Sequence, residues 1–122
     1  MRKSLSYLVI PLVACLLIAG CGGKKSKAKA GDPAEPDKVL FESALKDIDR
    51  GRHDVARLSL QTLLNTYPDS EYVAKAKLAM GDSYYKQGGT SGLTQAVAEY
   101  KDFLTFFPFL EEAAYAQMQI GK

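Results

Sequence analysis

The strongest constraint on the fold is a residue pattern that occurs twice, 40 positions apart. Both copies follow the spacing A-x3-Φ-x2-Φ-x4-P, where Φ is a large apolar residue, as Ala56, Leu60, Leu63 and Pro68 and as Ala96, Tyr100, Phe103 and Pro108. The same offset pairs four further positions, Ala74 with Ala114, Ala76 with Ala116, Leu78 with Met118 and Gly81 with Gly121. Internal repeats with a period of about 20–50 residues are typical of stacked supersecondary units. The sequence therefore predicts a repeat protein.

Each unit of the repeat is expected to be a pair of helices. In the first helix, apolar residues recur at i, i+1, i+4, i+5 and i+8 as Leu40, Phe41, Ala44, Leu45 and Ile48. Gly51 is expected to end this helix, and His53 or Asp54 to lie near the start of the next. The apolar face of that second helix consists of Val55, Leu58, Leu60, Leu63 and Leu64. Pro68 stops it, because the residue before a proline is kept away from helical angles.

The boundaries of the repeats follow from the same signals. We expect units at about residues 37–69 and 70–109, with the second unit helical to Gln87, turning through residues 88–92 and helical again to Phe106. A third unit begins at residue 110, and only its first helix, residues 112–122, is present. Because a repeat cannot bury its apolar face alone, we expect the sequence to be part of a longer chain, unless this helix serves as a cap.

Small residues occupy the positions at which paired helices would approach each other closely. Ala44 and Ala56 in the first unit, Gly81 and Ala96 in the second, and the prolines Pro68 and Pro108 resemble the pattern of the tetratricopeptide repeat family. Met80, Gly81 and Tyr84 also resemble its Leu-Gly-x2-Tyr motif. The ordinary unit has about 34 residues, so we place three extra residues between Pro68 and Gly81 and three in the turn at 88–92. The resemblance implies an all-α fold of tetratricopeptide-like helical hairpins, stacked as a short right-handed α-solenoid.

Residues 1–20 have the architecture of a signal peptide, with a basic start at Arg2 and Lys3 and an apolar run that ends at Ile18. As a helix, residues 7–18 would span only ~18 Å, against the ~30 Å of a bilayer core. Residues 18–21, Ile-Ala-Gly-Cys, resemble a bacterial lipobox, which implies cleavage before Cys21 and lipidation of its nucleophilic thiol. The alternative is a chance cysteine beside a conventional cleavage site.

The segment after Cys21 is expected to be a tether. Residues 22–36 contain no aromatic or branched aliphatic residue and hold four lysines and two prolines, so they cannot form a core. As a coil they would average ~20 Å end to end. The lysines either contact anionic headgroups or keep the tether soluble. Cys15 lies in the segment to be removed, which leaves neither a disulfide nor a cysteine zinc site.

The mature chain carries no sign of catalysis or of nucleic-acid binding. Cleavage removes Arg2 and Lys3, which leaves 14 basic against 14 acidic residues rather than the basic stripe of a nucleic-acid-binding protein. His53 is the only histidine, and it reads as a solvated or capping residue. Three carboxylates read as a solvated helix side and a cap (Asp47, Asp49 and Asp54), and the "GGTSG" of residues 88–92 as a turn without a P-loop lysine. We therefore expect neither an enzyme, a metal site nor a cofactor.

Two surfaces are candidates for binding a partner. In the family, the first helix of each unit lines a concave groove, which implies groove positions Lys75, Leu78, Asp82, Tyr85 and Lys86 in the second unit and Lys38, Phe41, Leu45, Ile48 and Asp49 in the first. In this groove, lysines would bind a peptide's carboxylate beside an aromatic side chain. Phe41, Leu45 and Ile48 fit the core better than the groove.

The second candidate surface is formed by aromatic residues near Pro108. Tyr100, Phe103 and Phe107 share a core face of one helix. Phe106 and Phe109 exceed what a small core needs and could bind a partner.

The lipobox, the tether and the stretch "YPDSEYVAKAKLAMGDSYYKQG" together resemble the amino-terminal half of the BamD (ComL or YfiO) family. The resemblance implies a lipid-anchored periplasmic scaffold that brings nascent outer-membrane proteins to BamA in the β-barrel assembly machinery. The later repeats associated with BamA are absent. Gly22 after the cysteine points to the outer membrane. The alternative is a Tol-associated or cell-division coordinator of the CpoB or YbgF type, which usually has a coiled coil and a plain signal peptide.

Overall fold

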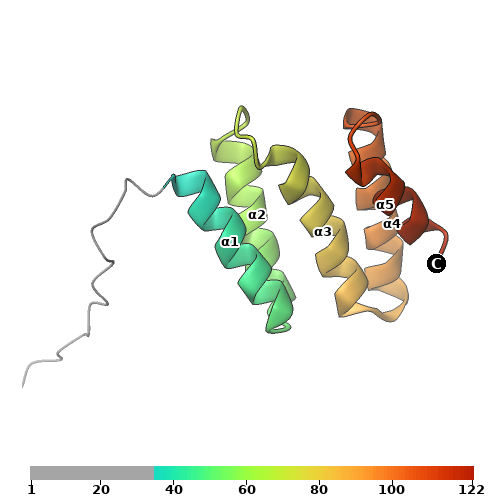
Figure 1. The fold of residues 1–122 in the computed structure, drawn as a ribbon. Helices are drawn as coiled ribbons and strands as arrows, with labels where there is room; N and C mark the ends of the chain where they lie inside the picture. The colour runs from blue at the N-terminus through green and yellow to red at the C-terminus, as the bar shows by residue number, and fades with distance from the viewer. Residues whose placement is uncertain (1–34) are drawn as a thin grey trace, which may run out of the picture. The chain divides into compact units, whose positions relative to one another are not determined.

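The computed structural model describes residues 35–122, which form five α-helices and no strand (Figure 1). The predicted signal peptide, Cys21 and nearly all of the predicted tether lie outside the described residues. The helices are α1 (Pro36–Asp49), α2 (His53–Thr66), α3 (Val73–Gln87), α4 (Gly89–Phe106) and α5 (Glu112–Ile120). The prediction of an all-α fold of tetratricopeptide-like helical repeats is confirmed.

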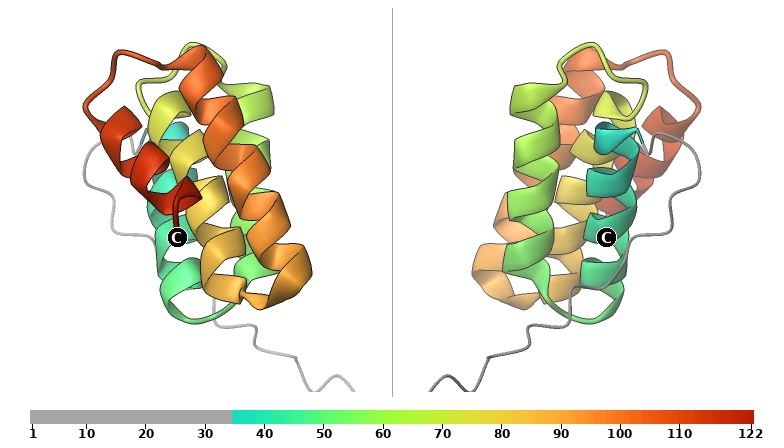
Figure 2. Two further views of the ribbon diagram at one scale, coloured as in Figure 1. Left: turned by 90° about the vertical axis from the view of Figure 1, so that its right-hand side faces the viewer. Right: turned by 90° about the vertical axis from the view of Figure 1, so that its left-hand side faces the viewer.

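The helices pack in the order in which they occur in the chain. Contacts join α1 to α2, α2 to α3, α3 to α4 and α4 to α5, and a smaller set joins α1 to α3. The first helices of the three units, α1, α3 and α5, lie on one side, and α2 and α4 lie on the other (Figure 2, left). We call the side formed by α1, α3 and α5 the first-helix surface.

Local signals set most helix ends. Pro36 occupies the first turn of α1, where its missing N–H costs no hydrogen bond. Gly51 follows α1 with a φ of 74°, which a residue with a Cβ rarely adopts. Both second helices, α2 and α4, end two residues before their prolines, Pro68 and Pro108, as expected.

The connection between α3 and α4 is shorter than predicted. The turn was placed at residues 88–92, but α4 already begins at Gly89, and only Gly88 lies between the two helices. Positive φ angles at Gly88 and Gly89 reverse the chain within two residues. The three residues assigned to a longer turn therefore lengthen α4, which has 18 residues against the 14 of α2.

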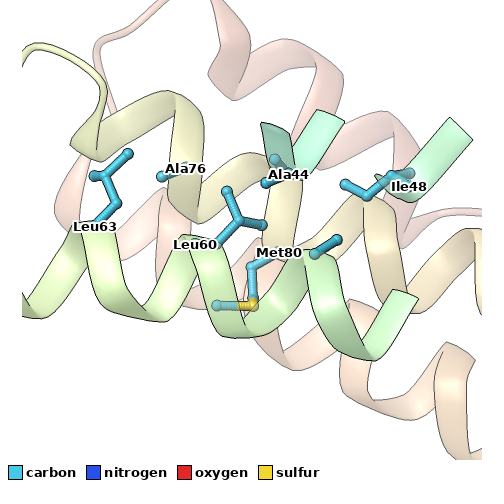
Figure 3. Close-up of a cluster of buried hydrophobic side chains, with 8 residues drawn as sticks. Ala44, Ile48, Leu60, Leu63, Ala76 and Met80 are labelled. Carbon is cyan, nitrogen blue, oxygen red and sulfur yellow. The ribbon is translucent and has the colours of Figure 1, made fainter. Parts of the chain in front are cut away.

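Two clusters of buried side chains form the core. The first lies between α1, α2 and α3 and contains Ala44, Ile48, Ala56, Leu60, Leu63, Ala76, Ala79 and Met80 (Figure 3). The second lies between α4 and α5, with residues of α3 packed against it, and contains Ala96, Tyr100, Phe103, Ala113 and Ala116. Tyr84 of α3 packs against both clusters. The helix α3 therefore joins the two repeat units.

Glycine permits the close packing of α3 on α4 at two points. A Cβ at Gly81 would lie 2.6 Å from Cε1 of Tyr100, which is fully buried. A Cβ at Gly92 would lie 2.9 Å from the carbonyl oxygen of Tyr84. Gly92 was predicted as a turn residue, but it serves a contact between helices instead.

None of the helices in residues 35–122 combines the length and the apolar character that crossing a bilayer requires.

Candidate functional site

The five predicted groove residues of the second unit all lie on α3. Lys75, Leu78, Asp82 and Tyr85 follow one another at intervals of three or four residues, so they share one face of the helix. Lys86 lies next to this face. The contacts of these side chains differ along α3, and we therefore describe the first-helix surface in three parts.

The first part, at the amino-terminal end of α3, contains an aromatic pair flanked by lysines. The rings of Phe41 and Tyr72 have centroids 5.3 Å apart, tilted by 32°. The Nζ of Lys75 lies 5.7 Å from the centroid of the Tyr72 ring. Lys38, on the first turn of α1, is exposed. This combination offers an aromatic surface and two positive charges to a ligand. We call Phe41, Tyr72, Lys38 and Lys75 the aromatic–lysine site.

Hydrogen bonds hold Tyr72 in this position. The Oγ of Ser70 donates to Oδ2 of Asp37 over 2.5 Å and accepts from the backbone N–H of Tyr72 over 3.0 Å. The bond from Ser70 lowers the pKa of the Asp37 carboxyl, and burial raises the pKa of the Tyr72 hydroxyl. The loop before α3 is thus tied to the first turn of α1. Tyr72 was missing from the predicted site. The sequence could have indicated Tyr72, because it precedes Lys75 by three residues and would lie beside it on a helix.

In the second part of the first-helix surface, the Asp82 carboxylate accepts hydrogen bonds from two neighbouring helices. Its Oδ1 accepts hydrogen bonds from Tyr100 on α4 over 2.6 Å and from Tyr115 on α5 over 2.8 Å. Nε2 of Gln119 donates to the Tyr115 oxygen over 2.7 Å. Burial, followed by the bond to Asp82, raises the pKa of both tyrosine hydroxyls, so they remain neutral donors. This Asp82 network joins three helices through one carboxylate.

Two other predicted groove residues of α3 are half-buried beside that network. Leu78 and Tyr85 pack against the second core cluster. The Nζ of Lys122 lies 6.0 Å from the centroid of the Tyr85 ring. Both side chains therefore support α4 and α5 while still lying at the first-helix surface.

The third part, at the carboxyl-terminal end of α3, is an ion pair with α1. The Nζ of Lys86 lies 3.0 Å from Oδ1 of Asp49, and about half or more of each side chain is exposed. An exposed pair of this kind contributes about 0–1 kcal/mol. It brings together two residues that were assigned to the groove separately.

The apolar residues of α1 differ in their burial. Ile48 is buried and Phe41 is half-buried against the first core cluster, as expected. Leu45, which was also expected in the core, is 39% exposed. It lies about 100° around the helix from the fully buried Ala44, at the edge of the apolar stripe. Leu45 therefore adds apolar area to the first-helix surface.

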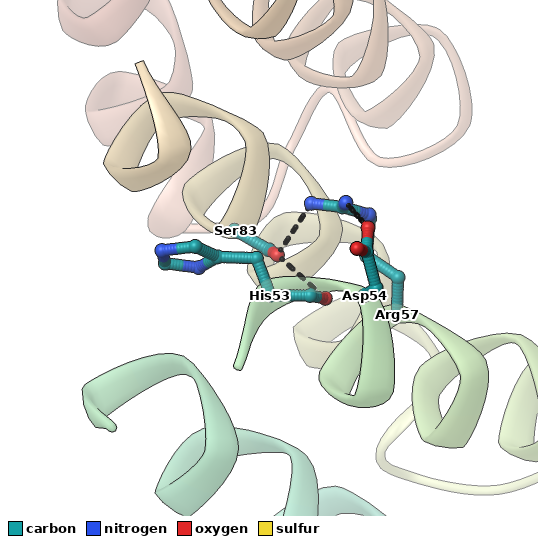
Figure 4. A network of polar contacts seen from close by, with 4 residues as sticks. All are labelled: His53, Asp54, Arg57 and Ser83. Carbon is teal, nitrogen blue, oxygen red and sulfur yellow. Dashed lines mark hydrogen bonds and ion pairs between the residues drawn. The ribbon is translucent and has the colours of Figure 1, made fainter. Parts of the chain in front are cut away.

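The residues that resembled fragments of a catalytic site form structural contacts (Figure 4). His53 and Asp54 lie in the first turn of α2, where neither side chain caps the helix. Arg57 pairs with Asp54, donates to Oγ of Ser83 over 3.1 Å and lies 4.2 Å from the centroid of the Tyr84 ring. Ser83 is fully buried, and its Oγ lies 3.4 Å from the carbonyl oxygen of His53. The cluster connects α2 to α3.

One of the three carboxylates expected to be solvated or capping is buried. Asp47 is 5% exposed and pairs with Arg52 in the turn after α1. The backbone N–H of Arg52 also donates to the carbonyl oxygen of Asp47 over 2.8 Å. The charge of Asp47 therefore stabilises the hairpin between α1 and α2. In residues 35–122, no three His, Cys, Asp or Glu side chains come together in a geometry that could hold a metal ion.

The aromatic residues at the end of α4 divide as predicted. Tyr100 and Phe103 are fully buried, and Phe107 packs against the same cluster, with its ring 5.5 Å from that of Phe103. Phe106 and Phe109 are 61% and 99% exposed.

Stacked helix pairs with small residues at their crossings and tyrosines along the first-helix surface define a tetratricopeptide-like scaffold. Scaffolds of this class commonly bind other polypeptides. The chain belongs to the YfiO family of outer membrane lipoproteins, whose family model matches residues 33–120. The match spans both complete units and α5. It confirms the resemblance to this family, and the predicted lipobox lies outside the matched residues. No solved structure matches the chain significantly.

Proposed function

We propose that this protein is a lipid-anchored scaffold on the periplasmic face of the outer membrane, in the β-barrel assembly machinery. Lipid on Cys21 would hold it to the bilayer, because two or more acyl chains anchor a protein stably. Its role would be to bind nascent outer-membrane proteins and to present them to a BamA-type barrel subunit. It would act by binding alone, without catalysis or a cofactor. Membership of an outer membrane lipoprotein family supports this assignment.

The observation that carries the proposal is the aromatic–lysine site. The rings of Phe41 and Tyr72, 5.3 Å apart, offer a surface on which an aromatic side chain of a peptide can stack. Lys38 and Lys75 flank these rings with positive charges that a carboxylate can approach. Unfolded segments of barrel proteins alternate apolar and polar residues, and an aromatic residue beside a carboxylate would fit this site.

Charge reversal at the site tests the proposal. The double variant Lys38→Glu/Lys75→Glu should bind a labelled peptide that carries an aromatic residue and a free carboxylate at least about tenfold more weakly, or roughly 1.4 kcal/mol. Fluorescence anisotropy measures the affinity. Both lysines are exposed, so the fold should be retained, which circular dichroism checks.

The matched control is Lys101→Glu, at an exposed lysine of α4 outside the first-helix surface. It should leave the affinity unchanged. Equal affinities for the double variant and the wild type would exclude the aromatic–lysine site as the peptide-binding site.

A further inference from the structure

The last residue of α4 and the loop that follows it expose three large apolar side chains. Phe106 is 61%, Phe109 99% and Leu110 41% exposed. We call these three residues the apolar loop patch. The Nζ of Lys77 lies 4.8 Å from the centroid of the Phe106 ring, and Phe106 is 61% exposed despite this contact.

The loop backbone does not require apolar residues at these positions. The equivalent residues of the preceding loop, 40 positions earlier, are the polar Thr66, Asp69 and Ser70. The two loops share the same backbone hydrogen bonds. In the first loop, the backbone N–H of Tyr67 donates to the carbonyl oxygen of Leu63, and that of Ser70 donates to the carbonyl oxygen of Tyr67. In the second loop, the N–H of Phe107 donates to the carbonyl oxygen of Phe103, and that of Leu110 donates to the carbonyl oxygen of Phe107. The apolar character of the second loop is therefore an addition to a loop that forms with polar residues.

The patch lies at the end of the helices where the described chain begins. Because the helices alternate in direction, the start of α1, the loop before α3 and the loop before α5 are all at this end (Figure 1). Only 13 residues lie between Cys21 and Glu35. Even fully extended, they reach about 50 Å. A lipid on Cys21 would thus keep this end of the helices close to the bilayer and raise its effective concentration there.

We propose that the apolar loop patch inserts into the lipid interface as a second membrane contact. This inference rests on the lipid anchor of the proposed function. The free energy falls when exposed phenylalanine and leucine side chains move from water to the boundary between headgroups and acyl chains. The aromatic–lysine site lies at the same end of the helices, so the contact would hold that site next to the membrane surface.

Charge determines which lipid surface the patch contacts. Glu111 and Glu112 follow the patch directly, and Asp69 and Glu71 lie in the neighbouring loop at the same end. These four carboxylates outnumber the two exposed lysines of the aromatic–lysine site at the same end, Lys38 and Lys75, so this end has no net attraction for anionic headgroups. The contact is therefore made with zwitterionic lipid, depends on apolar insertion and persists at high salt, unlike an electrostatic contact of the tether lysines.

The sequence contains no tryptophan, which allows a direct test. The Phe109→Trp variant introduces a single fluorophore at the most exposed residue of the patch. The full lipoprotein is isolated from membranes and reconstituted into phosphatidylethanolamine–phosphatidylcholine vesicles that contain a spin-labelled quencher lipid. The matched control is Leu58→Trp, at a residue that is 69% exposed and lies in the amino-terminal half of α2, whereas the patch lies at the end where α2 finishes.

Insertion predicts a blue-shifted emission for Phe109→Trp and quenching several-fold stronger than for Leu58→Trp, at low and at high salt. Equal quenching of the two variants on vesicle-bound protein would overturn the contact and leave the lipid anchor standing. The anchor has its own test, because Cys21→Ala lacks the thiol that is acylated and should accumulate as an unlipidated, uncleaved precursor; mature-sized Cys21→Ala protein in the membrane fraction would overturn the anchor. If the lipid-bearing form stays in solution when vesicles are floated, the anchor fails, and the membrane contact that rests on it fails as well.

Discussion

At the scale of single residues, the sequence predicts burial better than it predicts partners. The spacing of apolar residues placed Tyr100 and Phe103 in the core, where both are fully buried. The same spacing could not show that Asp82 would bind Tyr100 and Tyr115, which lie 18 and 33 residues further along the chain. A periodic pattern identifies the face on which a residue lies. It does not identify which side chains of other helices meet it there.

Gly81 provides a residue-level test of the helix packing. In Gly81→Ala, the new Cβ would lie 2.6 Å from Cε1 of the fully buried Tyr100, which has no space to move away. The substitution should reduce the free energy of unfolding by about 1–3 kcal/mol, as overpacking of a core does. Urea denaturation followed by circular dichroism measures the loss.

The control for this variant is Gly121→Ala, at the equivalent position of the third unit. There the nearest atom to a new Cβ, the Met118 carbonyl oxygen, is 3.6 Å away, an ordinary contact. Its stability should stay within about 0.5 kcal/mol of the wild type. If Gly81→Ala is equally harmless, α3 and α4 do not pack as closely as described.

At the scale of helices, the sequence predicts ends that depend on local chemistry. Pro68 and Pro108 stop α2 and α4 because proline acts on the residue before it. The start of α4 was predicted too late because Gly92 was interpreted as a turn residue. Its role is to let α4 approach the Tyr84 carbonyl, and such a contact between helices leaves no local signal. For the proposed binding surface, the sequence identified the helices and both lysines but not Tyr72, whose backbone N–H is bonded to Ser70.

The attachment of α5 provides a test at this scale. Tyr115→Phe removes the hydrogen bond to Asp82 and deprives Gln119 of its acceptor, at a cost of about 1 kcal/mol. Amide hydrogen exchange should become faster in α5, while α1 and α2 keep their rates, because their cluster does not include Tyr115.

Met118→Ala is the matched control, because Met118 is a half-exposed residue of the same helix. It should change the exchange of α5 much less than Tyr115→Phe does. Unchanged exchange of α5 in Tyr115→Phe would show that apolar packing of Ala113 and Ala116 holds the helix without the Asp82 network.

At the scale of the whole molecule, the chain belongs to a family of outer membrane lipoproteins, and its helices α1, α3 and α5 share one side of a helical scaffold, where we propose that clients bind. The aromatic–lysine site and the apolar loop patch both lie at the end of the helices where the amino-terminal segment joins. A scaffold tethered in this way would hold an unfolded client near the bilayer into which the client inserts. The proteins that this scaffold binds would therefore define its role.

The most direct test of that role is an affinity purification of the natural-length lipoprotein from crosslinked cells, with partners identified by mass spectrometry. The account predicts recovery of a BamA-type barrel subunit together with nascent outer-membrane proteins, and a lower yield of the nascent proteins from the Lys38→Glu/Lys75→Glu variant. Recovery of Tol components without the barrel subunit would contradict the assembly role and assign the same repeats to a cell-division coordinator.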